Sequence, residues 1–211
     1  MTRLVVVSAG LSQPSSTRLL GERLAEATRR AIEPDRADGP EAPGAVEVIV
    51  VDLRDLAHDV VNNVLTGFPS PALADVLDQI ARADALIAVT PIFNASYSGL
   101  IKSFFDVIDP ELLRGRPVLI GATGGSERHS LALEHAVRPL FSYLHALVVP
   151  TSVYAASADW GTAEAGRALG ERIDRAGAEL AGLLVGKGVT GPVDPFANVP
   201  SFVTLLDPRS A

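Results

Sequence analysis

The chain has 211 residues, of which 47% are hydrophobic and 20% charged, a balance typical of one globular domain with a sizeable buried core. Its formal net charge is −7, and no run of lysine and arginine is longer than a pair. Because a nucleic-acid-binding surface must neutralise phosphates, this charge argues against that class of protein. The chain contains no cysteine, which excludes disulfides, thiolate metal sites and cysteine nucleophiles.

The amino terminus, MTRLVVVSAG, has too short an apolar run for a signal peptide and passes at once into a hydroxyl-rich turn. No segment approaches the ~20 apolar residues of a membrane span. The four histidines lack the spacing of a metal site. We therefore expect a cytoplasmic protein that holds no metal and does not bind membranes.

The first half of the chain alternates short β-branched runs with segments of helical periodicity. Strands are predicted at 4–7 and 46–51. Helices are predicted at 18–32 and from Ser70-Pro71, a favourable start for a helix, to about residue 83. Between them we expect an exposed loop at 33–45 and, at 54–70, irregular structure with room for a short helix.

The second half continues the alternation. Strands are predicted at 85–89, 117–122 and 148–153, and helices at 131–147, with an interrupted rhythm at 135–139, and 162–185. Strands that alternate with helices predict a parallel α/β sheet of five strands, covered on both faces, with ligand loops at the strand carboxyl ends. We expect one domain over 1–186 and a Gly/Pro-punctuated tail over 187–211 that docks on a neighbouring subunit or stays partly mobile.

The loop after the first predicted strand is rich in hydroxyl groups and leads into a helix. It lacks both the Rossmann and the Walker glycine patterns. Free backbone N–H groups and the helix dipole favour an anion at such a helix start, and hydroxyls add donors to a terminal phosphate. A long helix cap explains one or two of these hydroxyls, whereas the whole set favours a phosphate site. The set is Ser8, Ser12, Ser15, Ser16 and Thr17.

Two further loops follow predicted strands. After the third strand, Pro91, Ile92, Phe93 and Asn94 offer a rigid apolar wall and an amide for a flat heteroaromatic ring, although an ordinary strand–loop–helix turn explains them equally well. In that segment 96–98 is predicted to start a helix. After the fourth strand, the glycine pair in 121–129 lets the backbone approach a ligand, but taken alone it indicates a tight turn.

Together the three loops resemble the NAD(P)H-dependent FMN reductases of the flavodoxin-like superfamily, and most of all the reductase components of two-component flavin monooxygenase systems. The matching segments are SQPSST at 12–17, TPIFNASYSGLIK at 90–102 and ATGGS at 122–126, and the resemblance extends from residue 4 to about 155. It implies a flavodoxin-like three-layer sandwich with strand order 2-1-3-4-5. It also implies a homodimer or homotetramer.

The resemblance assigns roles to particular residues. Those expected to hold the FMN phosphate are Ser12, Ser15, Ser16 and Thr17, and Ser8 and Arg18 are also expected to contact the cofactor. Pro91, Ile92, Phe93 and Asn94 are expected to line the flavin ring, and Thr123, Gly124, Gly125 and Ser126 to meet its far edge. Ser98 is also expected to contact the cofactor. The family often has an arginine where this chain has Gln13; Arg18 either replaces that charge or forms a surface pair.

His135 lies where the sulfonate-linked subgroup has a helix bulge at its subunit interface, although a partly buried histidine without a special role is an equal alternative. Hydride transfer between nicotinamide and flavin is the chemistry of the two cofactors, so no residue is nominated as a general acid or base. The hydride donor is NADPH or NADH, and Arg18 and Arg128 are candidates to meet a 2′-phosphate.

Three rival functions are weighed. A quinone, azo or chromate reductase would keep its FMN bound, and a flavodoxin-type carrier would be reduced by a protein. A receiver-type signalling domain needs acidic residues after the first strand to hold Mg²⁺, where this chain has only Ser8-Ala9-Gly10. The favoured function is FMN reduction that supplies reduced flavin to a partner monooxygenase.

Overall fold

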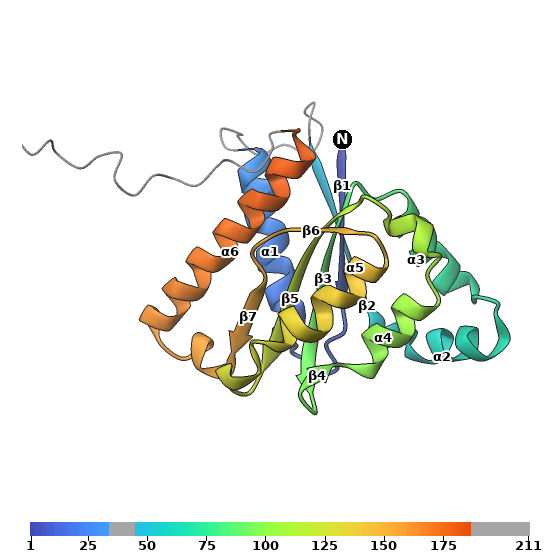
Figure 1. Ribbon diagram of the computed structural model, residues 1–211, viewed down its shortest axis with the longest axis horizontal. Helices are drawn as coiled ribbons and strands as arrows, with labels where there is room; N and C mark the ends of the chain where they lie inside the picture. Colours follow the sequence, from blue (N-terminus) through green and yellow to red (C-terminus); the bar gives the residue numbers. More distant parts are fainter. Residues whose placement is uncertain (34–44, 187–211) are drawn as a thin grey trace, which may run out of the picture.

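A computed structural model describes residues 1–33 and 45–186, so the predicted loop at 33–45 and the tail at 187–211 lie almost wholly outside the described residues. Its centre is one mainly parallel sheet with the path β2-β1-β3-β5-β6, while β7 pairs with β5 and β4 pairs with β3 (Figure 1). The strands are β1 (Thr2–Ser8), β2 (Val46–Asp52), β3 (Ala85–Phe93), β4 (Ser96–Tyr97), β5 (Pro117–Gly124), β6 (Leu147–Val148) and β7 (Val153–Ala156). This path confirms the expected flavodoxin-like order.

Helices cover both faces of the sheet (Figure 1). The α-helices are α1 (Ser16–Ile32), α2 (Ala57–Thr66), α3 (Pro71–Ala81), α4 (Gly99–Asp106), α5 (Arg138–Tyr143) and α6 (Ala163–Leu184). Helices α1 and α6 lie side by side on one face. They pack closely because Gly177 has no side chain: a Cβ there would come within 2.8 Å of the backbone of Ala27. Among the described residues, no helix is long and apolar enough to cross a membrane.

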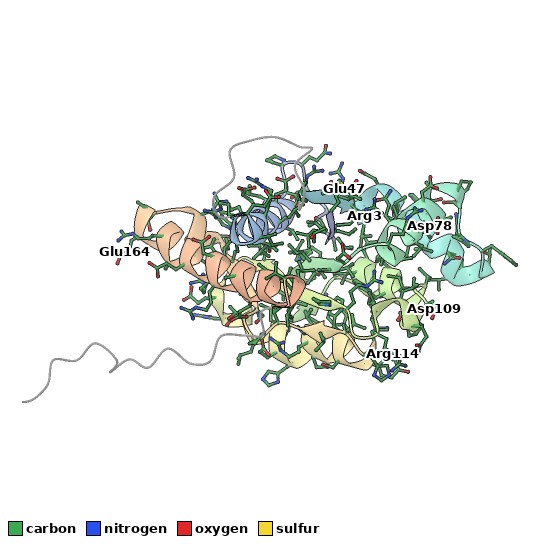
Figure 2. The ribbon with its side chains drawn as sticks, turned by 90° about the horizontal axis from the view of Figure 1, so that it is seen from above. Arg3, Glu47, Asp78, Asp109, Arg114 and Glu164 are labelled. Carbon is green, nitrogen blue, oxygen red and sulfur yellow. The ribbon has the colours of Figure 1, made fainter. Side chains whose placement is uncertain are left out.

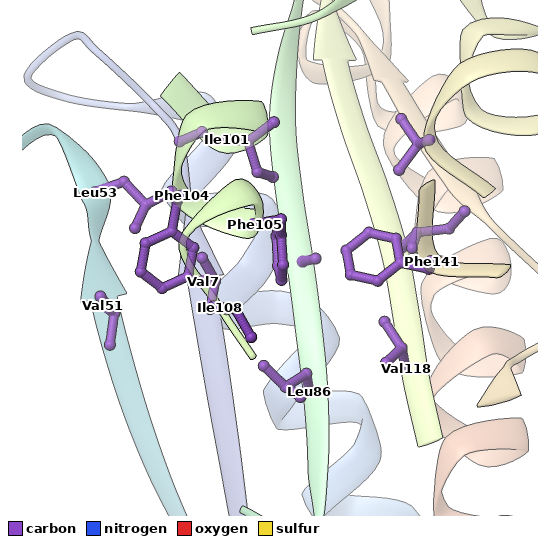
Figure 3. Close-up of a cluster of buried hydrophobic side chains, with 14 of the residues drawn as sticks. Val7, Val51, Leu53, Leu86, Ile101, Phe104, Phe105, Ile108, Val118 and Phe141 are labelled. Carbon is purple, nitrogen blue, oxygen red and sulfur yellow. The ribbon is translucent and has the colours of Figure 1, made fainter. Parts of the chain in front are cut away.

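The side chains of each central strand pack alternately into two separate cores, because successive residues of a strand point to opposite faces of the sheet. In β1, Val5 and Val7 belong to one buried cluster, while Leu4 and Val6 belong to the other. Helices α4 and α5 cover the first cluster. The rings of Phe105 in α4 and Phe141 in α5 pack edge to face there, with 4.8 Å between their centroids (Figure 3). Two buried faces explain why the strands are apolar throughout.

The predicted fifth strand at 148–153 is wrong in its boundaries. The structure has two short strands there, β6 and β7, and both pair in parallel with β5. Pro150 lies between them, and proline cannot donate a ladder hydrogen bond. The consequence is that the carboxyl end of the sheet extends to Ala156, which lies opposite Gly124.

The structure gives the bounds of two other predicted regions. The stretch at 54–70, predicted as irregular with room for a short helix, contains the end of a 3₁₀ turn (Leu53–Leu56) followed by the whole of α2. The predicted interruption of the helix at 135–139 corresponds to a π-helical turn at Leu133–Val137 that contains His135. That helix also ends before 147, because His145 has a left-handed backbone conformation, with φ of 57°.

Charged side chains are distributed over the outside of the molecule (Figure 2). Arg3 and Glu47 form an ion pair at 2.8 Å between neighbouring residues of β1 and β2, near the amino ends of both strands. The opposite, carboxyl ends of the strands meet at the other edge of the sheet, and the three loops singled out from the sequence follow them.

Candidate functional site

One cavity at the carboxyl edge of the sheet is lined by residues of all three loops. Its volume is about 600 Å³, within the usual range for small-molecule sites. The lining consists of Leu11, Ser12, Ser16, Thr17, Pro91, Ile92, Phe93, Thr123, Gly124, Gly125, Ala155, Ser157 and Trp160. We call it the flavin cavity, because most of the residues expected to contact a flavin lie in it.

The first loop meets the flavin cavity at the start of α1. Ser15 is the N-cap of that helix, and its hydroxyl accepts a hydrogen bond from the backbone N–H of Arg18 at 3.2 Å. The backbone N–H groups of Ser16 and Thr17 also lie in the first turn, where a helix supplies no carbonyl partner. Gly10 makes the loop fit, because a Cβ there would come within 2.0 Å of the Ser15 hydroxyl oxygen.

Two buried hydroxyls join the first and third loops. The Oγ1 atoms of Thr17 and Thr123 lie 2.7 Å apart, at hydrogen-bond distance, although 106 positions separate the residues in sequence. Their side chains are almost fully buried, with 3% and 5% exposed. This contact holds the start of α1 against the end of β5, so the two sides of the flavin cavity are positioned together.

The second loop is a hairpin arm made of the end of β3 and the two-residue strand β4. Asn94 and Ala95 form its turn with φ of 48° and 67°, the left-handed conformations of a tight hairpin turn. The helix expected to start at 96–98 starts at the end of that range: Ser98 is the N-cap of α4, while Ser96 and Tyr97 form β4. The arm is anchored at its base, where the Thr90 hydroxyl accepts a hydrogen bond from the backbone N–H of Ser98 at 3.1 Å.

The third loop is held in place by Tyr154 of β7. Its hydroxyl donates to the carbonyl oxygen of Ser126 at 2.7 Å, and its own pKa is raised by burial and by the nearby Asp159 carboxylate. Gly124 is needed for this contact, because a Cβ there would come within 2.1 Å of the Tyr154 hydroxyl. At Gly125 a Cβ would meet nothing, since that residue borders open space.

A fourth segment, formed by the end of β7 and the turn after it, completes the cavity and was missed by sequence reasoning. It contributes Ala155, Ser157 and Trp160, the single tryptophan of the chain. The guanidinium of Arg23 lies 4.9 Å from the centre of the Trp160 ring, a cation–π contact that ties this segment to α1. The rule that placed the other three loops at the carboxyl ends of strands also points to this one.

A second cavity of about 660 Å³ adjoins the flavin cavity and shares Ser12, Ser16 and Trp160 with it. Arg18 lies in this second cavity, where its side chain donates to Glu22 at 2.8 Å and also to Asp52. The hydrogen bond to Glu22, followed by that to Asp52, raises the pKa of Arg18 above its usual value. The guanidinium is therefore firmly protonated and already paired.

The structure separates the expected site residues into groups. The flavin cavity is lined by Ser12, Ser16, Thr17, Pro91, Ile92, Phe93, Thr123, Gly124 and Gly125. Ser15 and Arg18 line only the second cavity of these two. Four expected residues line neither: Ser8, Asn94, Ser98 and Ser126. Ser8 is fully buried at the end of β1, and Ser98 is the N-cap of α4, its hydroxyl accepting from the Ile101 N–H.

A parallel sheet with this strand order, helices on both faces and a cavity at the carboxyl ends of its strands defines a flavodoxin-like protein. The family model described as NADPH-dependent FMN reductase matches residues 2–161. This match covers well over half of the chain, and the chain belongs to that family.

Individual relatives agree with the family assignment. The FMN reductase (NADPH) of Pseudomonas aeruginosa is 37% identical over 158 residues, which are 75% of this chain and 78% of that protein. The NADH-dependent FMN reductase SfnF of Pseudomonas fluorescens is 36% identical over 159 residues, with coverage of 75% and 78%. A solved oxidoreductase structure from Corynebacterium diphtheriae has 41% identity and a TM-score of 0.81, covering 88% of this chain and 98% of that one.

Proposed function

We propose that this chain binds FMN in the flavin cavity, that hydride is transferred there from NAD(P)H, and that the reduced flavin is released to a separate acceptor. The family membership supports the reaction, an NAD(P)H-dependent reduction of FMN. The observation that carries the location is the single cavity to which the hydroxyl-rich helix start, the apolar arm and the glycine loop all contribute.

The residues of the flavin cavity fit the two ends of FMN. A phosphate matches the start of α1, where the hydroxyls of Ser12, Ser16 and Thr17 and the free first-turn N–H groups offer donors. An apolar ring system matches Pro91, Ile92 and the half-exposed Phe93. When bound, FMN accepts a hydride from a reduced nicotinamide, which is chemistry that the flavin itself supplies.

The chain contributes positioning rather than acid–base chemistry in this proposal. The Thr17–Thr123 pair and the Tyr154–Ser126 hydrogen bond hold the two ends of the cavity at a constant separation. A constant separation orients the ring and excludes water from one of its faces, which raises the rate of a reaction between two bound molecules. The exposed side chain of Phe93 indicates that the arm leaves room for a second ring to approach.

The direct test is to supply purified protein with FMN and either NADH or NADPH and to follow the absorbance of the nicotinamide. Oxidation that requires both protein and added FMN supports the proposal. If FMN does not bind in calorimetry, or no nicotinamide is oxidised, the proposal is wrong. If yellow colour remains with the protein through gel filtration, the rival with retained flavin, which reduces quinones, azo dyes or chromate, replaces release to a partner monooxygenase.

Self-association forms part of the proposal. The π-helical turn at Leu133–Val137 contains His135, the position at which the sequence resemblance implies an interface bulge. Large apolar side chains near it in sequence are exposed in the single chain: Leu131 is 63% exposed and Tyr143 is 79% exposed. Sedimentation velocity tests this idea, with a dimer or tetramer expected and Tyr143→Glu shifting the population toward the monomer. A monomer at micromolar concentration contradicts it.

A further inference from the structure

The second cavity meets the flavin cavity at the hydroxyl-rich start of α1, and most of its lining lies beyond that shared part. It adjoins the flavin cavity and extends along the outer side of α1 to the end of β2. Besides polar residues of the first loop, it has an apolar part formed by Leu19, which is 40% exposed, and Trp160. Its charged lining consists of Arg18, Glu22, Asp52 and Arg54.

We propose that the second cavity binds the adenosine end of the nicotinamide dinucleotide, and that Asp52 favours a free 2′-hydroxyl over a 2′-phosphate there. The inference rests on the proposed function, because a hydride donor is needed only if FMN is reduced in the flavin cavity. It goes further by assigning a place to the other half of the donor and a preference for NADH over NADPH.

The position and shape of the second cavity support its assignment to the adenosine end of the dinucleotide. A dinucleotide that puts its nicotinamide over a flavin must extend away from it, and the second cavity begins where the flavin cavity ends, at Ser12, Ser16 and Trp160. Its volume of about 660 Å³ falls within the range of ligand sites. The indole of Trp160 supplies a flat aromatic surface, the kind of group on which nucleic acid bases stack.

The charged side chains of the second cavity support a preference for NADH over NADPH. The two guanidiniums of the lining, Arg18 and Arg54, are balanced by the two carboxylates of Glu22 and Asp52, so the cavity has no surplus positive charge. A 2′-phosphate carries up to two negative charges and would meet Asp52, whose side chain is only 14% exposed and is held by Arg18. A ribose hydroxyl can instead donate to that carboxylate and accept from the guanidinium.

The place of Asp52 in the sheet keeps this carboxylate at the site. It is the last residue of β2 and lies opposite Ser8, the last residue of β1, immediately before the first loop. The ion pair with Arg18 therefore joins β2 to α1 in the lining of the second cavity. The Asp52 carboxylate therefore contacts a ligand that extends from the start of α1 toward β2.

The test measures binding rather than turnover. Protein saturated with FMN is titrated with adenosine 5′-monophosphate and, separately, with adenosine 2′,5′-bisphosphate, by calorimetry and by the fluorescence of Trp160, the single tryptophan. The monophosphate is expected to bind while FMN remains bound, to change the emission of Trp160, and to bind more tightly than the bisphosphate.

Two variants and one control sharpen the test. Asp52→Asn is expected to shift the affinity ratio toward the bisphosphate by about tenfold, because one buried negative charge is removed. Leu19→Tyr narrows the second cavity and is expected to weaken monophosphate binding without changing FMN binding. The matched control is Glu47→Gln, which removes the carboxylate of another arginine-paired residue of β2 at the far end of that strand, with no change in the ratio (Figure 2).

The possible failures are distinguishable. If FMN binds and is reduced but the monophosphate does not bind, or displaces FMN, the second cavity is not the adenosine site and the proposed function stands. If the monophosphate binds but wild-type protein prefers the bisphosphate, or Asp52→Asn leaves the ratio unchanged, the role of Asp52 is wrong. If FMN itself does not bind, the proposed function fails first.

Discussion

The first loop and the hairpin arm line the same cavity but differ in how firmly the surrounding structure holds them. The first loop is held by a helix cap at Ser15, a close approach at Gly10 and a buried hydroxyl pair at Thr17. The arm is anchored at its base through Thr90 and through the packing of Ile92 and Tyr97 against the core, while its tip, from Phe93 to Ala95, is exposed. In the proposed function, the part of the site that meets the FMN phosphate is therefore preorganised, whereas the part that meets the ring supplies mainly apolar area.

The largest effect is expected from Gly10→Val in the first loop. A Cβ at this position conflicts with the Ser15 hydroxyl, so the cap and the donors around it must move. Loss of two or so charge-assisted hydrogen bonds is expected to weaken FMN binding about a hundredfold and to leave riboflavin binding nearly unchanged. Calorimetry with both ligands measures this.

The control for that variant is Gly99→Ala, where a Cβ would meet nothing. An equal loss of FMN and riboflavin affinity in Gly10→Val would contradict a specific role in phosphate binding. Retention of the wild-type preference for FMN over riboflavin would do the same.

A smaller and differently shaped effect is expected from Phe93→Ala in the arm. Removing an aromatic side chain from the cavity wall is expected to weaken FMN and riboflavin binding by the same factor, about tenfold. Phe68→Ala removes a phenylalanine that is 78% exposed and lines neither cavity, and serves as the control. Titrations followed by flavin fluorescence measure both affinities. A change in the ratio of FMN to riboflavin affinity would show that the arm, like the first loop, acts on the phosphate.

Tyr154→Phe is expected to act on the third loop with a smaller effect still. It removes the hydrogen bond to the Ser126 carbonyl while keeping the ring. We expect a loss of about 1 kcal/mol in the free energy of unfolding and about a threefold weaker affinity for FMN. Urea unfolding and FMN titration of the same preparations measure both, and unchanged values would mean that the loop is positioned without this bond.

The smallest effect is expected from Ala95→Gly at the tip of the arm. A left-handed alanine is strained, but glycine also gains entropy in the unfolded chain, so the two contributions largely cancel. We expect a gain of no more than about 0.5 kcal/mol in the free energy of unfolding and no change in flavin affinity. A clear loss of stability in thermal unfolding would show that the turn at Asn94 and Ala95 is not strained.

Local signals explain what could be predicted of the fold. Ser70 caps α3 ahead of its proline, as its sequence indicates, and the break in rhythm near His135 corresponds to a π-helical turn. The split of the fifth strand was not predicted, because the β-branched residues Val148, Val149, Thr151 and Val153 on both sides of Pro150 look like one strand. Likewise Ser98 belongs to a hydroxyl-rich segment but is used as a helix cap, which only the position of α4 reveals.

By itself, the sequence determined the alternation of strands and helices, the hydroxyl-rich first loop and the family to which this chain is similar, because each depends on neighbours along the chain. Only the tertiary structure placed Trp160 between the two cavities and Asp52 beside Arg18. These residues come from different strands and loops, so no spacing in the sequence relates them. The parallel sheet brings its carboxyl ends to one edge, and that edge decides which side chains form a site.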